Sequence, residues 1–124
     1  MKRIAISMCV IAATTTIALA ASPIKVTTDS GDVIAGSNTY RTLYVYAEDS
    51  EGMSNCYDEC ADKWPPHVAE YWDTPRPPFS TIERKDGKKQ WAKDGMPLYF
   101  STLDEAKGDT KGEGVDGLWT AARP

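Results

Sequence analysis

The sequence has little of what enzyme active sites are usually built from. It contains one histidine, three cysteines and two phenylalanines among 124 residues. It has no G-x-S-x-G, H-E-x-x-H, Walker or dinucleotide-binding glycine pattern, and no C-x-x-C-H that would attach haem. We therefore predict that the protein is not an enzyme and needs no cofactor, with copper as the one alternative considered below.

Positive charge is scarce beyond the first three residues. Without Lys2 and Arg3 the chain has 12 basic residues (14 less these two) against 18 acidic ones, a net charge of −6. Such a surface repels a phosphate backbone, which excludes nucleic acid as an expected partner. No basic amphipathic stretch suggests binding to an anionic membrane.

The long apolar run that a membrane anchor needs is also missing. Lys2 and Arg3 precede an apolar run over 4–18, and Ala18-Leu19-Ala20 is a small-x-small cleavage site. A spanning helix needs about 20 apolar residues, so we predict a cleaved signal peptide over 1–20. Residues 21–124 then form a single secreted domain in the periplasm or the medium, with no transmembrane anchor after cleavage.

What the sequence does contain is one internal repeat. Both halves read L-Y-x4-D-x14-W at a constant offset, which pairs Leu43 with Leu98, Tyr44 with Tyr99, Asp49 with Asp104, and Trp64 with Trp119. A repeat of this kind predicts two similar units packed together. We place repeat one at 24–66, a connector at 67–78 and repeat two at 79–124.

This pattern resembles a family of bacterial secreted repeat proteins marked by a Y-x4-D motif, many of them predicted lipoproteins of unestablished function. The resemblance covers residues 43–66, 79–100 and 107–124. Tyr44, Tyr46 and Asp49 fit a version with an aromatic residue in the middle, whereas repeat two has Ser101 there. Trp119 is followed by threonine where the family often has histidine. The resemblance implies a fold and no mechanism.

Each half is expected to form three strands followed by a segment that ends in tryptophan. The strands of repeat one are predicted at 24–28, 32–35 and 42–46, and those of repeat two at 81–85, 88–92 and 97–100, with Asp86-Gly87 as a hairpin turn. A short helix is predicted over 54–63 with Ser54 as its N-cap. The fold class is thus mainly β, a β-rich α+β domain of two pseudo-symmetric three-stranded units, arranged as one continuous sheet or as a sandwich.

Three interpretations of Cys56 and Cys60 remain open: a structural disulfide, a copper site and a redox-active pair. Four residues apart on a helix they lie on one face, and export to an oxidising compartment favours a disulfide between them. Met53, Cys56, Cys60 and His67 could instead converge on copper, since thioether, thiolate and imidazole suit Cu(I). A thiol-disulfide redox protein is a weaker alternative, because the C-x-x-C spacing is absent.

The repeated tyrosine, aspartate and tryptophan are interpreted as structural residues. Asp49 and Asp104 should accept backbone N–H bonds in the turn after each strand, while Tyr44 and Tyr99 pack and hydrogen-bond. We therefore predict an exported repeat protein with a structural or binding role in the cell envelope. Its partner is expected to be an envelope protein or a small ligand.

Overall fold

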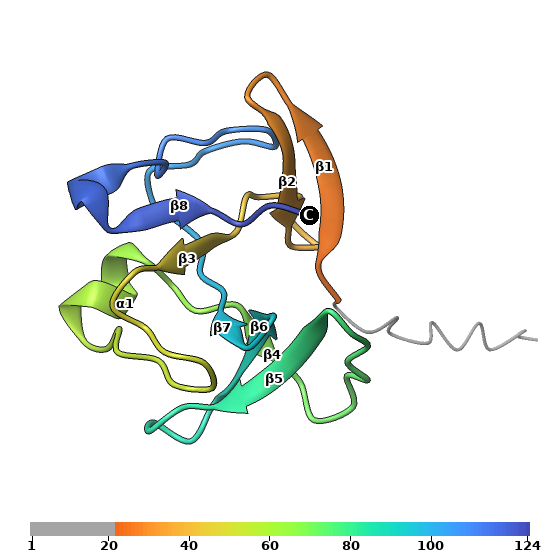
Figure 1. Ribbon diagram of the computed structural model, residues 1–124, viewed down its shortest axis with the longest axis vertical. Helices are drawn as coiled ribbons and strands as arrows, with labels where there is room; N and C mark the ends of the chain where they lie inside the picture. Colours follow the sequence, from red (N-terminus) through yellow and green to blue (C-terminus); the bar gives the residue numbers. More distant parts are fainter. Residues whose placement is uncertain (1–21) are drawn as a thin grey trace, which may run out of the picture.

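The computed structural model describes residues 22–124, so the expected signal peptide over 1–20 and Ala21 lie outside the described residues. The described part is mainly β with one short α-helix (Figure 1). Its elements are β1 Ile24–Thr28, β2 Gly31–Ala35, β3 Tyr44–Tyr46, α1 Glu59–Lys63, β4 Val68–Ala69, β5 Phe79–Glu83, β6 Lys89–Lys93, β7 Met96–Pro97, the 3-10 helix η1 Val115–Gly117 and β8 Trp119–Ala121.

Each repeat begins with the antiparallel hairpin that its turn residues predict. β1 pairs with β2 around a turn that ends at Gly31, and β5 pairs with β6 around Gly87. Both glycines adopt a positive φ, 102° and 84°, which a side chain would oppose. Figure 1 shows the two hairpins at opposite ends of the molecule, with β3 and β8 between them.

The strands of residues 22–124 form three small sheets, so the mainly β fold class is confirmed but its expected arrangement as one sheet or a sandwich is wrong. The sheets are β1-β2, β3-β8, and β4-β6-β5 with β7 paired to β6. The third strand of each repeat is too short to extend its own hairpin into a wide sheet. Each third strand pairs with its own hairpin only at its start, through Ala35 and Thr42 in repeat one and through Ala92 and Pro97 in repeat two. Beyond that point it pairs with the segment at the tryptophan of the other repeat, or with the other third strand.

The pairing of these segments obeys a pseudo-two-fold axis. Tyr44 lies opposite Ala121, and the equivalent positions of the other repeat, Tyr99 and Pro66, form the matching bridge. On the axis itself, Tyr44 and Tyr99 exchange two backbone hydrogen bonds of 2.7 and 3.0 Å. The two repeats therefore form one small domain in which each supplies pairing partners to the other.

His67 belongs to this paired region, although the sequence analysis places it in the connector over 67–78. Its backbone N–H donates to the Leu98 carbonyl at 3.0 Å, as that of Ala122 donates to Leu43 at 2.8 Å. Its side chain is buried, with 8% of the residue exposed. The exposed part of the connector begins beyond β4, where Tyr71 and Trp72 contact each other at the surface.

The helix of repeat one is shorter than the sequence predicts. It covers Glu59–Lys63 and starts after Asp58, which has a positive φ of 55° and forms no side-chain cap. Ser54 is no N-cap, because its hydroxyl is 2.6 Å from the Tyr99 hydroxyl in the interior. The Ser54 hydroxyl still accepts the Cys56 backbone N–H at 3.3 Å, but the helix begins four residues further on.

The interior is built on the aromatic residues that the repeat pattern marks. Tyr44, Tyr99 and Trp91 have no exposed surface, and Trp119 and Trp64 expose 3% and 6%. These five rings therefore form the core of the domain. Most of them, with Cys56, belong to one cluster beside the axis, whereas Trp91 packs in a second cluster with Leu43 and Leu98.

Candidate functional site

The repeated tyrosines and aspartates form two buried hydrogen bonds that cross between repeats. The Tyr44 hydroxyl donates to Asp104 Oδ2 at 2.6 Å, and the Tyr99 hydroxyl donates to Asp49 Oδ2 at 2.6 Å. The other carboxylate oxygen of each aspartate accepts a backbone N–H, from Lys111 at 2.9 Å and from Asn55 at 2.7 Å. Each pair thus joins the third strand of one repeat to the loop of the other.

Burial changes the proton affinities of these pairs. It raises the pKa of Asp104 and of Asp49 above the usual carboxyl value, against the opposing effect of the tyrosine hydroxyl and the backbone N–H. Burial also raises the pKa of Tyr44 and Tyr99, so both remain protonated donors across the physiological range. Nothing in this arrangement exposes a base or a nucleophile to a substrate, because each oxygen named here has a protein partner.

The raised carboxyl pKa values predict a pH dependence of stability. A group whose folded pKa is raised stabilises the fold below its unfolded pKa, and this contribution is lost as the pH rises through the folded value. The unfolding free energy of the wild type minus that of Asp104→Asn should therefore decrease from about pH 3 to neutral pH. Denaturant titrations at several pH values measure this difference.

Asp49→Asn should show the same trend, because Asp49 occupies the equivalent position in the other repeat. The carboxyls with lowered pKa values, Asp86 and Asp109, act in the opposite direction. They are present in both proteins of each comparison, so their effect largely cancels. A difference that stays flat or increases with pH would contradict the assigned direction.

A stack of aromatic rings crosses the pseudo-two-fold axis. The Trp64 and Trp119 rings are parallel, with centroids 3.9 Å apart and an interplanar angle of 3°. Tyr44 meets Trp64 edge-on at 5.4 Å, and Tyr99 meets Trp119 edge-on at 5.2 Å. On one side the stack continues, because Tyr46 lies on Trp119 at 4.3 Å and 13°.

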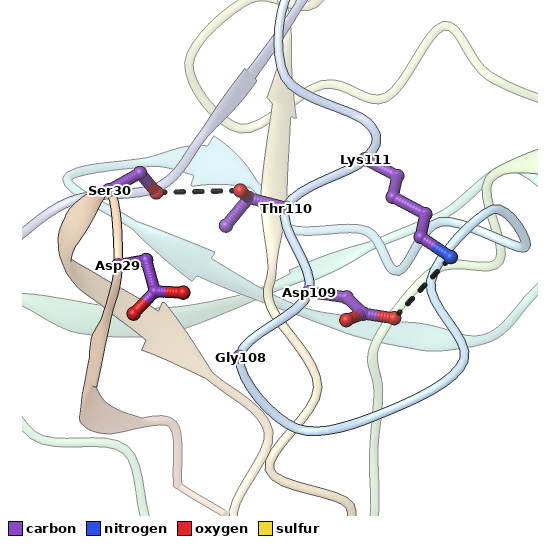
Figure 2. Close-up of a pocket in the computed structure, with 6 residues that line it drawn as sticks. All are labelled: Asp29, Ser30, Gly108, Asp109, Thr110 and Lys111. Carbon is purple, nitrogen blue, oxygen red and sulfur yellow. Dashed lines mark hydrogen bonds and ion pairs between the residues drawn. The ribbon is translucent and has the colours of Figure 1, made fainter.

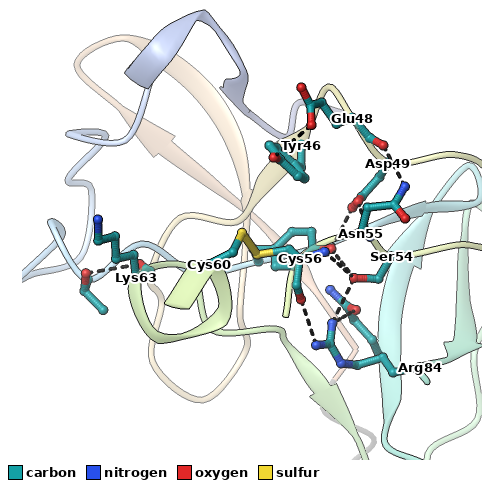
Figure 3. The surroundings of a disulfide bond; sticks show 12 residues. Tyr46, Glu48, Asp49, Ser54, Asn55, Cys56, Cys60, Lys63 and Arg84 are labelled. Atoms are coloured by element: carbon teal, nitrogen blue, oxygen red, sulfur yellow. Dashed lines mark hydrogen bonds between the residues drawn. A yellow bond between two sulfur atoms is a disulfide. The ribbon is translucent and has the colours of Figure 1, made fainter. Parts of the chain in front are cut away.

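The residues considered for copper do not form a site in the structure. Cys56 and Cys60 form a disulfide of 2.03 Å (Figure 3), which leaves no thiolate as a ligand. Met53 is 50% exposed, whereas His67 is buried with its ring centroid 4.9 Å from that of Phe100. Residues 22–124 contain no group of three His, Cys, Asp or Glu side chains placed to hold a metal ion.

A buried arginine, which the sequence analysis did not single out, lies beside the disulfide. Figure 3 shows the Arg84 guanidinium pointing at Ser54 and Cys56, where it donates to the Ser54 hydroxyl at 3.0 Å and to the Cys56 carbonyl at 2.9 Å. It also donates to Gln90 Oε1 at 2.8 Å and to the more exposed Asp86 at 3.1 Å. The local sequence gives no signal for the burial of Arg84, because Arg84 is flanked by the charged residues Glu83 and Lys85.

A groove passes beside the stacked tryptophans, between α1 and η1, and we call it the tryptophan groove. Its larger pocket, of about 400 Å³, is lined by Lys63, Trp64, Ser101, Thr102, Leu103, Val115 and Asp116. Its smaller pocket, of about 230 Å³, is lined by Tyr46, Glu59, Cys60, Lys63, Trp64, Asp116, Leu118 and Trp119. The pockets share Lys63, Trp64 and Asp116, so they form one feature.

The two pockets of the tryptophan groove are pseudo-symmetric counterparts. Four lining positions of the larger pocket have their equivalent in the other repeat among the lining positions of the smaller one. These pairs are Lys63 and Leu118, Trp64 and Trp119, Ser101 and Tyr46, and Val115 and Cys60. The groove is therefore built by the duplication, and its two ends differ through substitutions within the repeat.

A second, polar pocket lies between the β1–β2 turn and the glycine-rich tail (Figure 2). It has a volume of about 420 Å³ and brings Asp29 and Ser30 opposite Asp109 and Thr110. The Asp109 carboxylate already accepts two backbone N–H bonds and lies 3.8 Å from the Lys111 ammonium. This pocket is open and its main acid is occupied, which makes it a weaker candidate than the tryptophan groove.

The fold and this groove define a class of protein, a small β-rich domain made of two interlocked repeats. The chain belongs to the Lipoprotein_15 family, described as a secreted repeat of unknown function, whose model matches residues 25–67 and 80–123. The two matched segments correspond closely to the two repeats described above. No curated protein and no solved structure matches the chain. Among residues 22–124, no helix has the length and apolar character that a membrane crossing requires.

Proposed function

We propose that this protein is a non-catalytic binding protein of the cell envelope, which takes a small ligand into the tryptophan groove. The observation that supports the proposal most directly is the larger pocket of the groove, a partly enclosed and mainly apolar surface at the junction of the repeats. Export to the periplasm or the medium agrees with the secreted family and with the disulfide.

A non-catalytic role is favoured by how the repeated polar residues are used. Tyr44, Asp104, Tyr99 and Asp49 are buried and bonded to one another, so they hold the repeats together. The groove offers an apolar wall and a few charges at its rim, which suits recognition.

The test is a binding screen on the protein purified after export. Uniformly ¹⁵N-labelled protein is titrated separately with L-phenylalanine, glucose, glycyl-glycine, spermidine, octanoate and adenosine. At least one probe should shift the signals of Leu103, Val115 and Asp116 saturably, while those of Tyr71 and Trp72 in the distant connector stay unchanged. If no probe shifts the groove signals, or if the shifts cluster elsewhere, the proposed function is wrong.

A further inference from the structure

We infer that the Cys56–Cys60 disulfide is a thiol-exchange site, which an external dithiol attacks at Cys60 and opens while the domain stays folded. This inference goes beyond the proposed function and does not depend on it, since it requires no ligand in the groove. Three observations carry it: the unequal burial of the two cysteines, the buried Arg84 beside Cys56, and the weak attachment of the helix that carries Cys60.

As a structural link the disulfide contributes little. It joins residues only four apart in the sequence, so it closes a very short loop and restricts the unfolded chain less than a long-range bridge would. Repeat two has Lys111 and Val115 at the equivalent positions, and Val115 packs against the same aromatic cluster as Cys60 without a covalent bond. The repeat fold therefore does not require this bridge.

The first observation is that the two cysteines differ in access. Cys56 has no exposed surface and belongs to the cluster beside the pseudo-two-fold axis. Cys60 is only partly buried and lines the smaller pocket of the tryptophan groove with Glu59 and Lys63. The rate of thiol–disulfide exchange depends on which sulfur an incoming thiolate can reach. The pocket therefore directs the attack to the sulfur of Cys60.

The exchange proceeds in two balanced steps. In the first, a thiolate of the dithiol forms a bond to Cys60 Sγ, the bond between the two cysteines breaks, and its electron pair leaves on Cys56 Sγ as a thiolate. In the second, the other thiolate of the reagent attacks its partner sulfur, closes a cyclic disulfide and releases Cys60 as a thiolate. The two electrons and two protons that the dithiol loses end on the two cysteines.

The second observation is that Arg84 places a positive charge beside the residue on which the leaving thiolate forms. Arg84 is 3% exposed, and its Nη2 donates to the Cys56 carbonyl at 2.9 Å (Figure 3). Among residues 22–124, its two terminal nitrogens donate to neutral oxygens, while its carboxylate partner, Asp86, is bound at Nε. A neighbouring arginine stabilises a thiolate, so it favours the departure of Cys56.

The third observation is that little besides the disulfide attaches the start of α1. This helix has five residues, none of them buried, and no side-chain cap at its N-terminus. So short a helix is not stable on its own. Its end stays fixed, because the Lys63 carbonyl accepts the Thr102 N–H at 3.0 Å, whereas Cys60 is tied covalently to the interior through Cys56. Reduction should therefore loosen residues 58–62 and leave the axis intact.

The first experiment treats the purified protein, with its disulfide formed, with dithiothreitol and no denaturant. Alkylation and mass spectrometry should show complete reduction, while the circular dichroism stays unchanged. Hydrogen exchange should accelerate at least about tenfold at the amides of Cys60 and Asp62 and stay unchanged at those of Tyr44 and Tyr99 on the axis. Reduction that occurs only when the protein unfolds, or a reduced protein that loses protection on the axis, overturns the inference.

Two single-cysteine variants locate the attacked sulfur. Cys56→Ala leaves the thiol of Cys60, and Cys60→Ala leaves that of Cys56. With oxidised glutathione as the probe, Cys56→Ala should form a mixed disulfide at least about tenfold faster than Cys60→Ala, because its thiol lines the pocket. Limiting iodoacetamide on the reduced wild-type protein makes the same comparison without a substitution, and it should label Cys60 first. Equal rates, or a faster reaction at Cys56, overturn the inference.

Arg84→Met tests the role of the guanidinium. Dithiothreitol should reduce this variant at least about tenfold more slowly than the wild type, because the leaving thiolate loses its positive neighbour. A merely structural role predicts the opposite, since a less stable protein opens more often and is attacked faster. An unchanged or faster rate overturns the assignment of Arg84. None of these measurements uses a groove ligand, so this inference and the proposed function fail independently.

Discussion

Replacing Trp119 with alanine should lower the free energy of unfolding by about 3–5 kcal/mol. Trp119 is the ring with the most aromatic partners, since it contacts Trp64, Tyr46 and Tyr99 and exposes 3% of its surface. Its removal leaves a cavity on the pseudo-two-fold axis that neither repeat can close alone. A small domain has a total stability of about 5–15 kcal/mol, so the variant should be marginally folded.

The chain offers a matched control in Trp72→Ala. Trp72 is 50% exposed in the connector, where its ring contacts Tyr71. The same chemical change there should alter stability by less than about 1 kcal/mol. Urea denaturation followed by far-ultraviolet circular dichroism measures both variants without relying on tryptophan fluorescence. Equal effects at the two positions would show that the axial stack does not stabilise the fold.

Trp64→Ala should have a similar effect to Trp119→Ala, and the two effects should not add. The rings are parallel at 3.9 Å, so each single substitution already destroys the stacking interaction. A double variant should therefore lose less stability than the sum of the single losses. Strict additivity would indicate that the two tryptophans pack independently, which the pseudo-symmetric arrangement does not allow.

Local sequence signals predicted much of this fold. The β1–β2 and β5–β6 hairpins follow from turns at Gly31 and Gly87 flanked by alternating or β-branched residues. The constant offset between the two halves predicted the duplication and identified Tyr44, Trp64 and their counterparts as core residues. These features depend on residues close in sequence, or on a repetition that can be read directly.

The pairing of the strands could not be predicted in the same way. Tyr44 pairs with Ala121 and bridges to Tyr99, and both partners lie in the other repeat, far away along the chain. Alternation of side chains along a strand shows which face is buried but does not name the partner strand. The Tyr44–Asp104 and Tyr99–Asp49 bonds arise from this pairing, which is why the sequence did not identify the tyrosine partners of the aspartates. The backbone N–H bonds that both aspartates accept were predicted, because they are local.

The sequence-based prediction also assigned some residues to the wrong place, because tertiary contacts outweighed their local preference. Ser54 has the sequence context of a helix N-cap, yet its hydroxyl bonds to Tyr99 and Arg84 in the interior. His67 was assigned to the connector over 67–78 and is buried because the repeat pairing extends past Pro66. The change to Ser101 was visible in the sequence, but its place in the lining of the larger pocket required the structure.

Replacing Arg84 with methionine should lower the free energy of unfolding by about 3 kcal/mol. The guanidinium belongs to a residue that is only 3% exposed, and it donates to the Ser54 hydroxyl, the Cys56 carbonyl and Gln90 Oε1. Methionine keeps most of the side-chain length but leaves those oxygens buried without their charged donor. Arg84→Lys should lose less, because an ammonium replaces part of the hydrogen bonding but cannot reproduce the planar fork.

The pseudo-symmetry supplies the control for this prediction. The register of the two hairpins places Gln90 opposite Ile82 where repeat one has Val33 opposite Val26, so Gln90 is the polar counterpart of Val33. Adding Gln90→Val to Arg84→Met removes one of the stranded acceptors. The loss of unfolding free energy in the double variant should therefore be smaller than the sum of the two single losses, by about 1 kcal/mol or more.

Denaturant titration of the four proteins, with the disulfide kept oxidised, completes the cycle. If the loss in the double variant equals the sum of the single losses, Arg84 and Gln90 stabilise the fold independently. That result would contradict an energetic role for the 2.8 Å bond between them. The expected coupling would instead explain why the two repeats differ at this position of their hairpins. Repeat one packs valine at this position in its hairpin, whereas repeat two uses the Arg84–Gln90 pair to hold the Cys56 segment of repeat one.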